Sequence, residues 1–287
     1  MSYLRLNVGS QALSRYVDVS VVIPIENYSY FPPETPRHHV MPGMKMKPQF
    51  HPGMQFQTIY VLQAGEADDF YMFRHTGLEQ YARDNNVMLV CPGIANSFGV
   101  DTAYGIEYAA FISEELPAII QTLFPSSPKR EDNFVIGAAA GGNAALYNAV
   151  RYPEKFAAGV DISGGIGEHF DPANRMNNGR MASNFPIAKT TFADISEIVG
   201  SVYDMDHLTR KNQEEGRELA KLIFVHGSEE GRIGEAVRLD AEAAKALGYD
   251  TEYICIEGGL HNDAFWDEQF KAALDTYLPL RRTALNL

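Results

Sequence analysis

The stretch VIGAAAGG, residues 135–142, decides the fold of this chain. It continues a short apolar segment, NFVIG (133–137), which predicts a buried strand. It then passes directly into a run of small residues at helical spacing. Glycines at its third and seventh positions frame Ala139, and glycine allows a sharp turn from strand to helix. Small-residue runs also occur where a helix merely packs close to a sheet, so this stretch alone leaves two interpretations open.

Strands and helices alternate along the rest of the chain, and this rhythm predicts a mostly parallel sheet with helices on both faces. Pro117 is expected to kink the helical run 105–124 or to begin a new segment within it. The expected strands are VDVSVVIPI (17–25), QTIYVLQ (57–63), VMLVC (87–91), NFVIG (133–137), FAAGVDISG (156–164), KLIFVHGS (221–228) and TEYICIEGG (251–259), and the other expected helices are 77–86, 138–150, 234–248 and 264–278.

The 287 residues are expected to form a single domain (1–287), because the alternation is broken only once. Residues 165–220 are longer than an ordinary connection and polar, with Met, Phe and Arg mixed in. We interpret them as a cap or lid insertion over the carboxyl edge of the sheet. Phe170, Met176 and Phe185 are the side chains expected to reach a binding pocket from it.

Composition excludes several classes of protein. The formal net charge of −13 argues against nucleic acid and against anionic membrane surfaces, which both favour basic proteins. Two cysteines, Cys91 and Cys255, exclude a disulfide framework, and both lie in apolar runs where buried thiols are common. No signal segment or membrane-spanning stretch is recognisable, so a cytoplasmic protein is expected.

Two later loops carry residue types that suit acyl-transfer chemistry. KLIFVHGSEE ends an expected strand with Glu229 and Glu230, and GGLHNDAFWD places His261 between the last strand and the last helix. A nucleophilic site of the strand–turn–helix kind requires a nucleophile, an acid and a histidine in that chain order. Ala139, Glu230 and His261 follow this order, although a methyl group cannot attack a carbonyl carbon.

With these motifs the chain resembles the putative-esterase family of α/β-hydrolases, which includes esterase D (S-formylglutathione hydrolase), tributyrin esterases, cinnamoyl and feruloyl esterases and the mycolyltransferases. The resemblance extends from Val17 to Leu278. It rests on YVLQAG (60–65), on the run FGVDTAYGIEYAAFISEELPAII (98–120), on GAAAGGNAALYNAVRYPEKFAAGVDISGG (137–165), on HGSEE (226–230) and on GGLHNDAFWDEQF (258–270). It implies an α/β-hydrolase fold and hydrolysis of carboxylic esters, either short-chain or cinnamoyl and feruloyl, through an acyl-enzyme.

The resemblance also implies roles for single residues. Ala139 stands where the family has its nucleophilic serine, His261 matches the general base, and Glu230 matches the acid. The oxyanion-binding N–H groups map to Gly65 and Ala140. Tyr71 and Trp266 are candidates for the wall of the substrate pocket, with core packing as the plainer role for both.

The sequence departs from the family pattern at the nucleophile and at Gln63-Ala64, where relatives usually have His-Gly. A laboratory Ser→Ala substitution, made to trap a substrate, explains Ala139 only. A natural or designed relative with altered catalysis explains both departures. An inactive form of an esterase, a non-catalytic ester-binding protein and an acyltransferase are therefore the three functions considered, and Ser163 is a poor substitute nucleophile because it ends the next strand.

No cofactor and no metal ion are expected. His38, His39 and His51 lie in a Pro-rich stretch, and their spacing matches no known metal site. The glycines of the 137–142 turn lack the Lys-Ser/Thr pair of a phosphate-binding loop. The expected partner is a small-molecule ester, without nucleic acid or membrane, and the sequence leaves open whether the chain forms a homodimer.

Overall fold

The computed structural model describes all residues of the chain except 1, 33–45, 166–189, 193–197 and 287. Its main element is an eight-stranded sheet in the order β1-β2-β5-β4-β6-β7-β8-β9. Strand β2 is antiparallel to both of its neighbours, and the other pairs are parallel. The strands are β1 (Ser2–Ser10), β2 (Arg15–Ile23), β4 (Thr58–Leu62), β5 (Met88–Pro92), β6 (Asn133–Ala138), β7 (Ala158–Ile162), β8 (Lys221–Gly227) and β9 (Thr251–Ile256), and a small second sheet pairs β3 (Met54–Gln55) with β10 (Leu285–Asn286).

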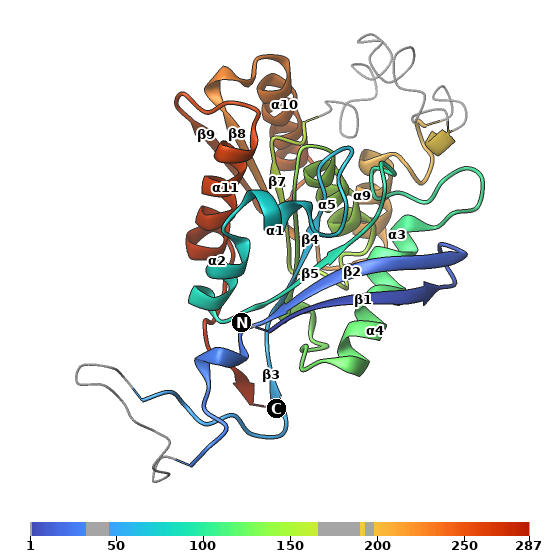
Figure 1. Ribbon diagram of the computed structural model, residues 1–287. Coiled ribbons are helices and arrows are strands. Elements are labelled where there is room, and N and C mark those ends of the chain that lie inside the picture. The colour runs from blue at the N-terminus through green and yellow to red at the C-terminus, as the bar shows by residue number, and fades with distance from the viewer. Residues whose placement is uncertain (1, 33–45, 166–189, 193–197, 287) are drawn as a thin grey trace.

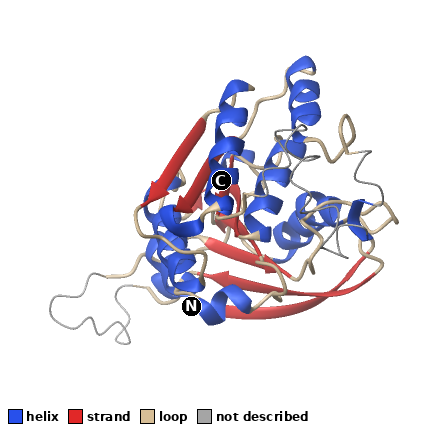
Figure 2. Ribbon diagram, turned by 90° about the horizontal axis from the view of Figure 1, so that it is seen from above, coloured by secondary structure: helices blue, strands red, loops and turns tan. Residues whose placement is uncertain are grey.

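Helices cover both faces of the large sheet, which twists between them (Figures 1 and 2). In Figure 1, α2 and α11 lie on one side of the strands and α4, α5 and α9 lie on the other. The prediction of a mostly parallel sheet covered on both faces is confirmed. The helices are α1 (Tyr71–His75), α2 (Leu78–Asn85), α3 (Tyr108–Ala110), α4 (Leu116–Leu123), α5 (Ala140–Arg151), α9 (Met205–Glu214), α10 (Arg232–Ala246) and α11 (Asp263–Ala272), with π-helical turns at Phe111–Glu115 and Ala273–Tyr277.

Each face of the sheet has its own hydrophobic core, because successive side chains of a strand point to opposite faces. Along β4, Tyr60 and Leu62 enter one core with residues of α4, α5, α9 and α10. Ile59 and Val61 enter the other with residues of α1, α2 and α11. All of these β4 side chains are buried, as the near-continuous apolar sequence of a central parallel strand requires.

The topology brings the loops of interest to one edge. The segments that follow β4, β6, β8 and β9 all leave the carboxyl ends of parallel strands, which lie at the same edge of the sheet. Gly65, Ala139, Glu230 and His261 lie in these four segments. Residues that are far apart in sequence therefore lie close together in space.

Three local expectations have definite outcomes in the structure. The helical run 105–124 does change at Pro117, which lies in the first turn of α4 after a π-helical turn. Cys91 is buried as expected, but Cys255 is exposed, because its strand β9 is the last of the sheet and has a neighbour on one side only. Among the described residues, no helix is both long and apolar enough to cross a membrane.

The predicted cap segment is described only in part. Phe170, Met176 and Phe185 lie outside the described residues. Of the remainder, Phe192 stacks on Phe98 with ring centroids 5.9 Å apart. Helix α9 contributes Met205 to the core that also contains residues of α5.

Candidate active site

Ala139 occupies a sharp turn between β6 and α5. Its backbone angles, φ 51° and ψ −124°, lie in a region that residues with a side chain rarely adopt, and α5 begins at the next residue. The Ala139 N–H donates to the carbonyl of Ile162 at 2.9 Å, which ties the turn to the end of β7. The strand, turn and helix expected from the sequence are therefore present, and the methyl group projects at the start of the helix.

The flanking glycines are required by close contact with neighbouring backbone. A Cβ atom on Gly137 would lie 2.2 Å from the carbonyl carbon of Gly141. A Cβ atom on Gly141 would lie 2.2 Å from the carbonyl oxygen of Leu62. Because backbone atoms cannot move aside as a flexible side chain can, the turn accepts only glycine at these two positions.

His261 lines the same cavity as Ala139, and its imidazole lies near the carboxylate of Glu230. His261 Nδ1 lies 3.7 Å from Glu230 Oε1, with the Glu230 side chain fully buried and the His261 side chain one-third exposed. At this distance the imidazole and the carboxylate do not form a hydrogen bond. The same carboxylate oxygen instead accepts a hydrogen bond of 2.5 Å from the Ser163 hydroxyl, while Glu230 Oε2 is buried without a partner among the described residues.

A second buried carboxylate lies at the end of β7. Asp161 Oδ1 accepts a hydrogen bond of 2.6 Å from the Gly164 N–H, and Asp161 Oδ2 has no partner among the described residues. Burial raises the pKa of Asp161 well above its usual range, and the neighbouring carboxylates of Asp240 and Glu230 raise it further.

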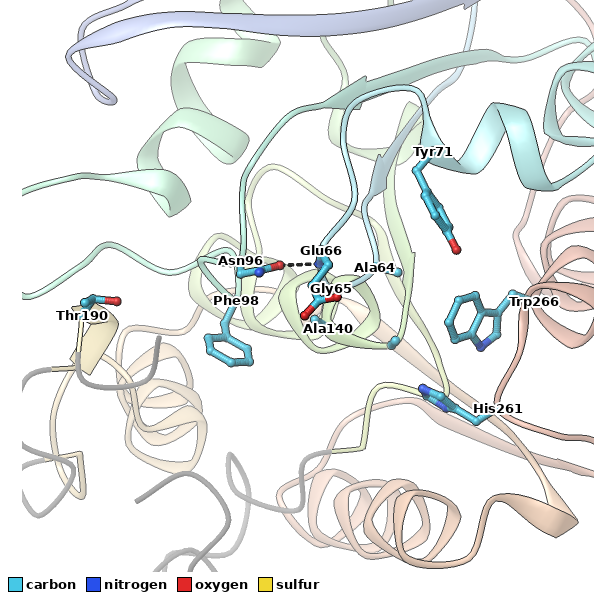
Figure 3. A pocket seen from close by; sticks show the side chains of 11 residues that line it. Ala64, Gly65, Glu66, Tyr71, Asn96, Phe98, Ala140, Thr190, His261 and Trp266 are labelled. Atoms are coloured by element: carbon cyan, nitrogen blue, oxygen red, sulfur yellow. Dashed lines mark hydrogen bonds between the residues drawn. The ribbon is translucent and has the colours of Figure 1, made fainter. Parts of the chain in front are cut away.

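The first turn of α11 fixes the position of His261. The next residue, Asn262, caps this helix by accepting a hydrogen bond of 2.9 Å from the Phe265 N–H. Trp266 projects from the same turn, and its ring meets the imidazole edge to face, at 89° and 5.1 Å between centroids (Figure 3). The indole Nε1 of Trp266 is buried and has no hydrogen-bond partner in the described part of the chain.

The segment after β4 lies beside the start of α5 and lines the same cavity as His261. Gly65 and Ala140 approach each other there, since a Cβ atom on Gly65 would lie 4.0 Å from that of Ala140. The first N–H groups of a helix have no partner within it, so the Ala140 N–H at the start of α5 has no acceptor within the helix.

Gln63, which departs from the family pattern together with Ala64, is buried and forms hydrogen bonds with the backbone of two loops. Its side-chain oxygen accepts a hydrogen bond of 2.9 Å from the Ile94 N–H. Its side-chain nitrogen donates to the carbonyl oxygens of Ala67 and Ala95. The glutamine therefore links the loop after β4 to the loop after β5.

A cavity of about 720 Å³ lies beside Ala139 and His261. Tyr71 lies on its wall, and its hydroxyl donates to both oxygens of Asp263, at 3.0 and 3.2 Å. Burial, followed by this contact, raises the pKa of Tyr71. The lining residues are Ala64, Gly65, Glu66, Tyr71, Asn96, Phe98, Ala139, Ala140, Thr190, His261 and Trp266.

Comparison with known proteins identifies the family of this chain. The family model described as "Putative esterase" matches residues 42–277, more than four-fifths of the chain. The chain belongs to this esterase family. A relative of the esterase, an acetyl esterase from Caldicellulosiruptor saccharolyticus, is 22% identical over 276 residues, which cover 96% of this chain and 97% of the relative.

Solved structures share the fold of this chain. FphF, a fluorophosphonate-binding serine hydrolase of Staphylococcus aureus in a substrate-bound structure, superimposes with a TM-score of 0.76 at 23% identity over 96% of this chain and 97% of that chain. An alanine mutant of the feruloyl esterase module from Clostridium thermocellum, complexed with sinapinate, gives a TM-score of 0.63 at 14% identity over 98% of this chain and 89% of that chain. The fold is therefore that of an α/β-hydrolase.

The esterase pocket also contains residues that sequence reasoning missed. Glu66, Asn96, Phe98 and Thr190 line it beside the expected residues. Glu66 directly follows Gly65, and this position was a usable signal. Phe98 begins the run 98–120 that carries part of the resemblance, whereas Asn96 lies in a loop and Thr190 in a short helical turn without a recognisable motif. Among the described residues no group of three or more potential metal ligands occurs, and His38 and His39 lie outside those residues.

Proposed function

We propose that this member of the esterase family binds carboxylic esters in the cavity beside Ala139 and that the chain, as it stands, does not turn them over. The observation that carries the proposal is the conformation of Ala139 at the head of α5, on the wall of the same cavity as His261. The position holds the strained backbone of a nucleophile turn, and only the hydroxyl group is missing.

The missing oxygen defines the chemistry that the substitution Ala139→Ser would restore. The introduced hydroxyl would attack the ester carbonyl while His261 accepts its proton, and the oxyanion would form opposite Gly65 and Ala140. His261 would then return the proton to the departing alcohol, which leaves an acyl-enzyme. Water, activated by His261, would release the carboxylic acid and regenerate the serine. Glu230 lies behind His261 and would stabilise the imidazolium ion.

The walls and size of the cavity support acyl groups that are short or aromatic. Its volume of about 720 Å³ lies within the usual range of small-molecule sites, and Phe98, Trp266 and Ala64 provide apolar surface. The relatives bear names that fit this range, an acetyl esterase and a feruloyl esterase module with bound sinapinate. We propose short-chain and cinnamoyl esters as the substrate class.

The test is the substitution Ala139→Ser, assayed with p-nitrophenyl butyrate and methyl ferulate. The unchanged chain is expected to hydrolyse both at close to the background rate. The serine variant should be faster by about three orders of magnitude or more, because groups of a triad act as a unit. It should also form a stable adduct with a fluorophosphonate, which reports on the nucleophile without any choice of substrate.

The matched control is His261→Ala in the serine variant, which should return hydrolysis to background while leaving the fold intact. A serine variant that folds, binds an ester and still fails to hydrolyse it or to react with the fluorophosphonate would contradict the proposal. The departure at Gln63-Ala64 would then mark a site that binds esters without this chemistry.

A further inference from the structure

Three carboxylates follow Gly65 in the sequence Glu66-Ala67-Asp68-Asp69. Two of them have an arginine partner. Asp68 pairs with Arg74 at 2.8 Å. Asp69 pairs with Arg5 at 2.6 Å and is almost fully buried. For Glu66, which lines the cavity, no cationic partner exists among the described residues.

The backbone holds Glu66 at the cavity. Its φ of 60° is left-handed, and its N–H donates to Asn96 Oδ1 at only 2.6 Å. Asn96 also approaches Gly65 closely, since a Cβ atom on Gly65 would lie 4.0 Å from Asn96 Oδ1. Figure 3 shows this hydrogen bond, with Glu66 next to Gly65 in the pocket that Ala140 also lines.

The remaining lining favours positive charge. No lysine or arginine lies among the described residues that line the cavity. Aromatic rings of Tyr71, Phe98 and Trp266 do line it, and the faces of such rings attract cations. The Tyr71 hydroxyl is bonded to a further carboxylate, that of Asp263.

We infer that the cavity selects esters that carry a positively charged ammonium group, and that Glu66 is the residue that determines this selectivity. This inference rests on the proposed function, which makes the ligand an ester. It adds the charge that the ester carries. An ester with an anionic group would place a second negative charge beside Glu66, in a cavity that no described lysine or arginine lines. Neutral esters would bind with intermediate affinity.

The test is isothermal titration calorimetry of the unchanged protein with three butyrate esters, none of which it is expected to hydrolyse. Butyrylcholine carries the ammonium group, 3,3-dimethylbutyl butyrate is its neutral isostere, and 3-carboxypropyl butyrate carries a carboxylate. At low ionic strength butyrylcholine should bind about fivefold or more tightly than the isostere, and the carboxylate ester should bind more weakly than the isostere. Added salt should reduce both differences, because Glu66 is exposed.

Glu66→Gln should bring the affinities of the three esters to within about twofold of one another, since the amide keeps the size and removes the charge. The matched control is Glu79→Gln, which neutralises an exposed carboxylate on α2 away from the cavity and should leave the preference unchanged. Equal binding of all three esters by the unchanged protein, or a preference that survives Glu66→Gln, would overturn the inference alone. Absence of binding by all three would overturn the proposed function and the inference with it.

Discussion

At the scale of single residues, the backbone of Ala139 is in an unfavourable conformation. Angles of φ 51° and ψ −124° cost a residue with a Cβ atom about 1–3 kcal/mol, whereas glycine adopts them freely. In a serine esterase this cost positions a nucleophile. In this chain the same cost remains although the side chain is a methyl group.

Ala139→Gly is therefore expected to stabilise the protein. Relief of the backbone strain outweighs the extra freedom that glycine gives the unfolded chain, which is about 0.5–1 kcal/mol. A net gain of about 1 kcal/mol would raise Tm by about 2–4 °C in a protein of this size. Ala140→Gly is the control, because Ala140 is the first residue of α5 and glycine weakens helices. Calorimetry that shows both variants destabilised equally would contradict this expectation.

At the scale of elements, the amino end of α11 determines where His261 lies. Asn262 is the cap of this helix, and His261 directly precedes it. Asn262→Ala should lower the free energy of unfolding by about 1 kcal/mol, the usual loss for a cap, whereas Asn262→Asp should preserve it. In the Ala139→Ser background the alanine variant should also lose kcat, because the imidazole is held less firmly. Urea unfolding and hydrolysis rates measured on both variants check this. A loss of stability of the same size in the aspartate variant would argue against the capping role.

The elements themselves differ in how well sequence predicts them. The central strands were predictable because burial on both faces makes them continuous apolar runs, and the turn at 137–141 was predictable because only small residues fit it. Strand β1 (Ser2–Ser10) was not predicted. It is an edge strand in which Leu4, Leu6 and Val8 are only partly buried, and their alternation with exposed residues was a usable signal.

The residues of the candidate site also differ in how well the sequence predicts them. Ala139, Glu230 and His261 were identified because each follows a strand in a recognisable local pattern. Asn96 reaches the cavity from a loop and Thr190 from a short helical turn, neither of which carries such a sequence pattern, and only the folded chain brings them to it. His261 lies 3.7 Å from Glu230, and the Ser163 hydroxyl donates a hydrogen bond to the same carboxylate oxygen. Both features depend on side-chain positions that no sequence pattern encodes.

At the scale of the whole molecule, the buried carboxyl group of Asp161 couples stability to pH. Its pKa is raised in the folded state, first by burial and then by Asp240 and Glu230. The folded protein therefore holds this proton to a higher pH than the unfolded chain does. Between the usual carboxyl pKa of about 3.9 and the raised value, the folded state binds more protons, so this group's contribution to stability falls as pH rises.

Asp161→Asn should remove that dependence. The variant keeps an oxygen for the Gly164 N–H and cannot become charged. Its stability relative to the unchanged protein should increase from mildly acidic to mildly alkaline pH and then level off above the raised pKa. Urea unfolding across this range gives the difference directly. A difference that stays constant with pH would mean that Asp161 does not titrate as its burial requires.

Trp266 is the single tryptophan of the chain, and it lies on the cavity wall in edge-to-face contact with His261. Light emitted by tryptophan therefore originates from one place in this protein, and that place is the ligand cavity. Excitation at the red edge of the indole band avoids the fifteen tyrosines. Entry of a ligand, or a change in the charge of the neighbouring imidazole, should then alter the emission without any label. The protein carries its own optical reporter for the cavity, and a bound ester that is not turned over would keep that signal steady.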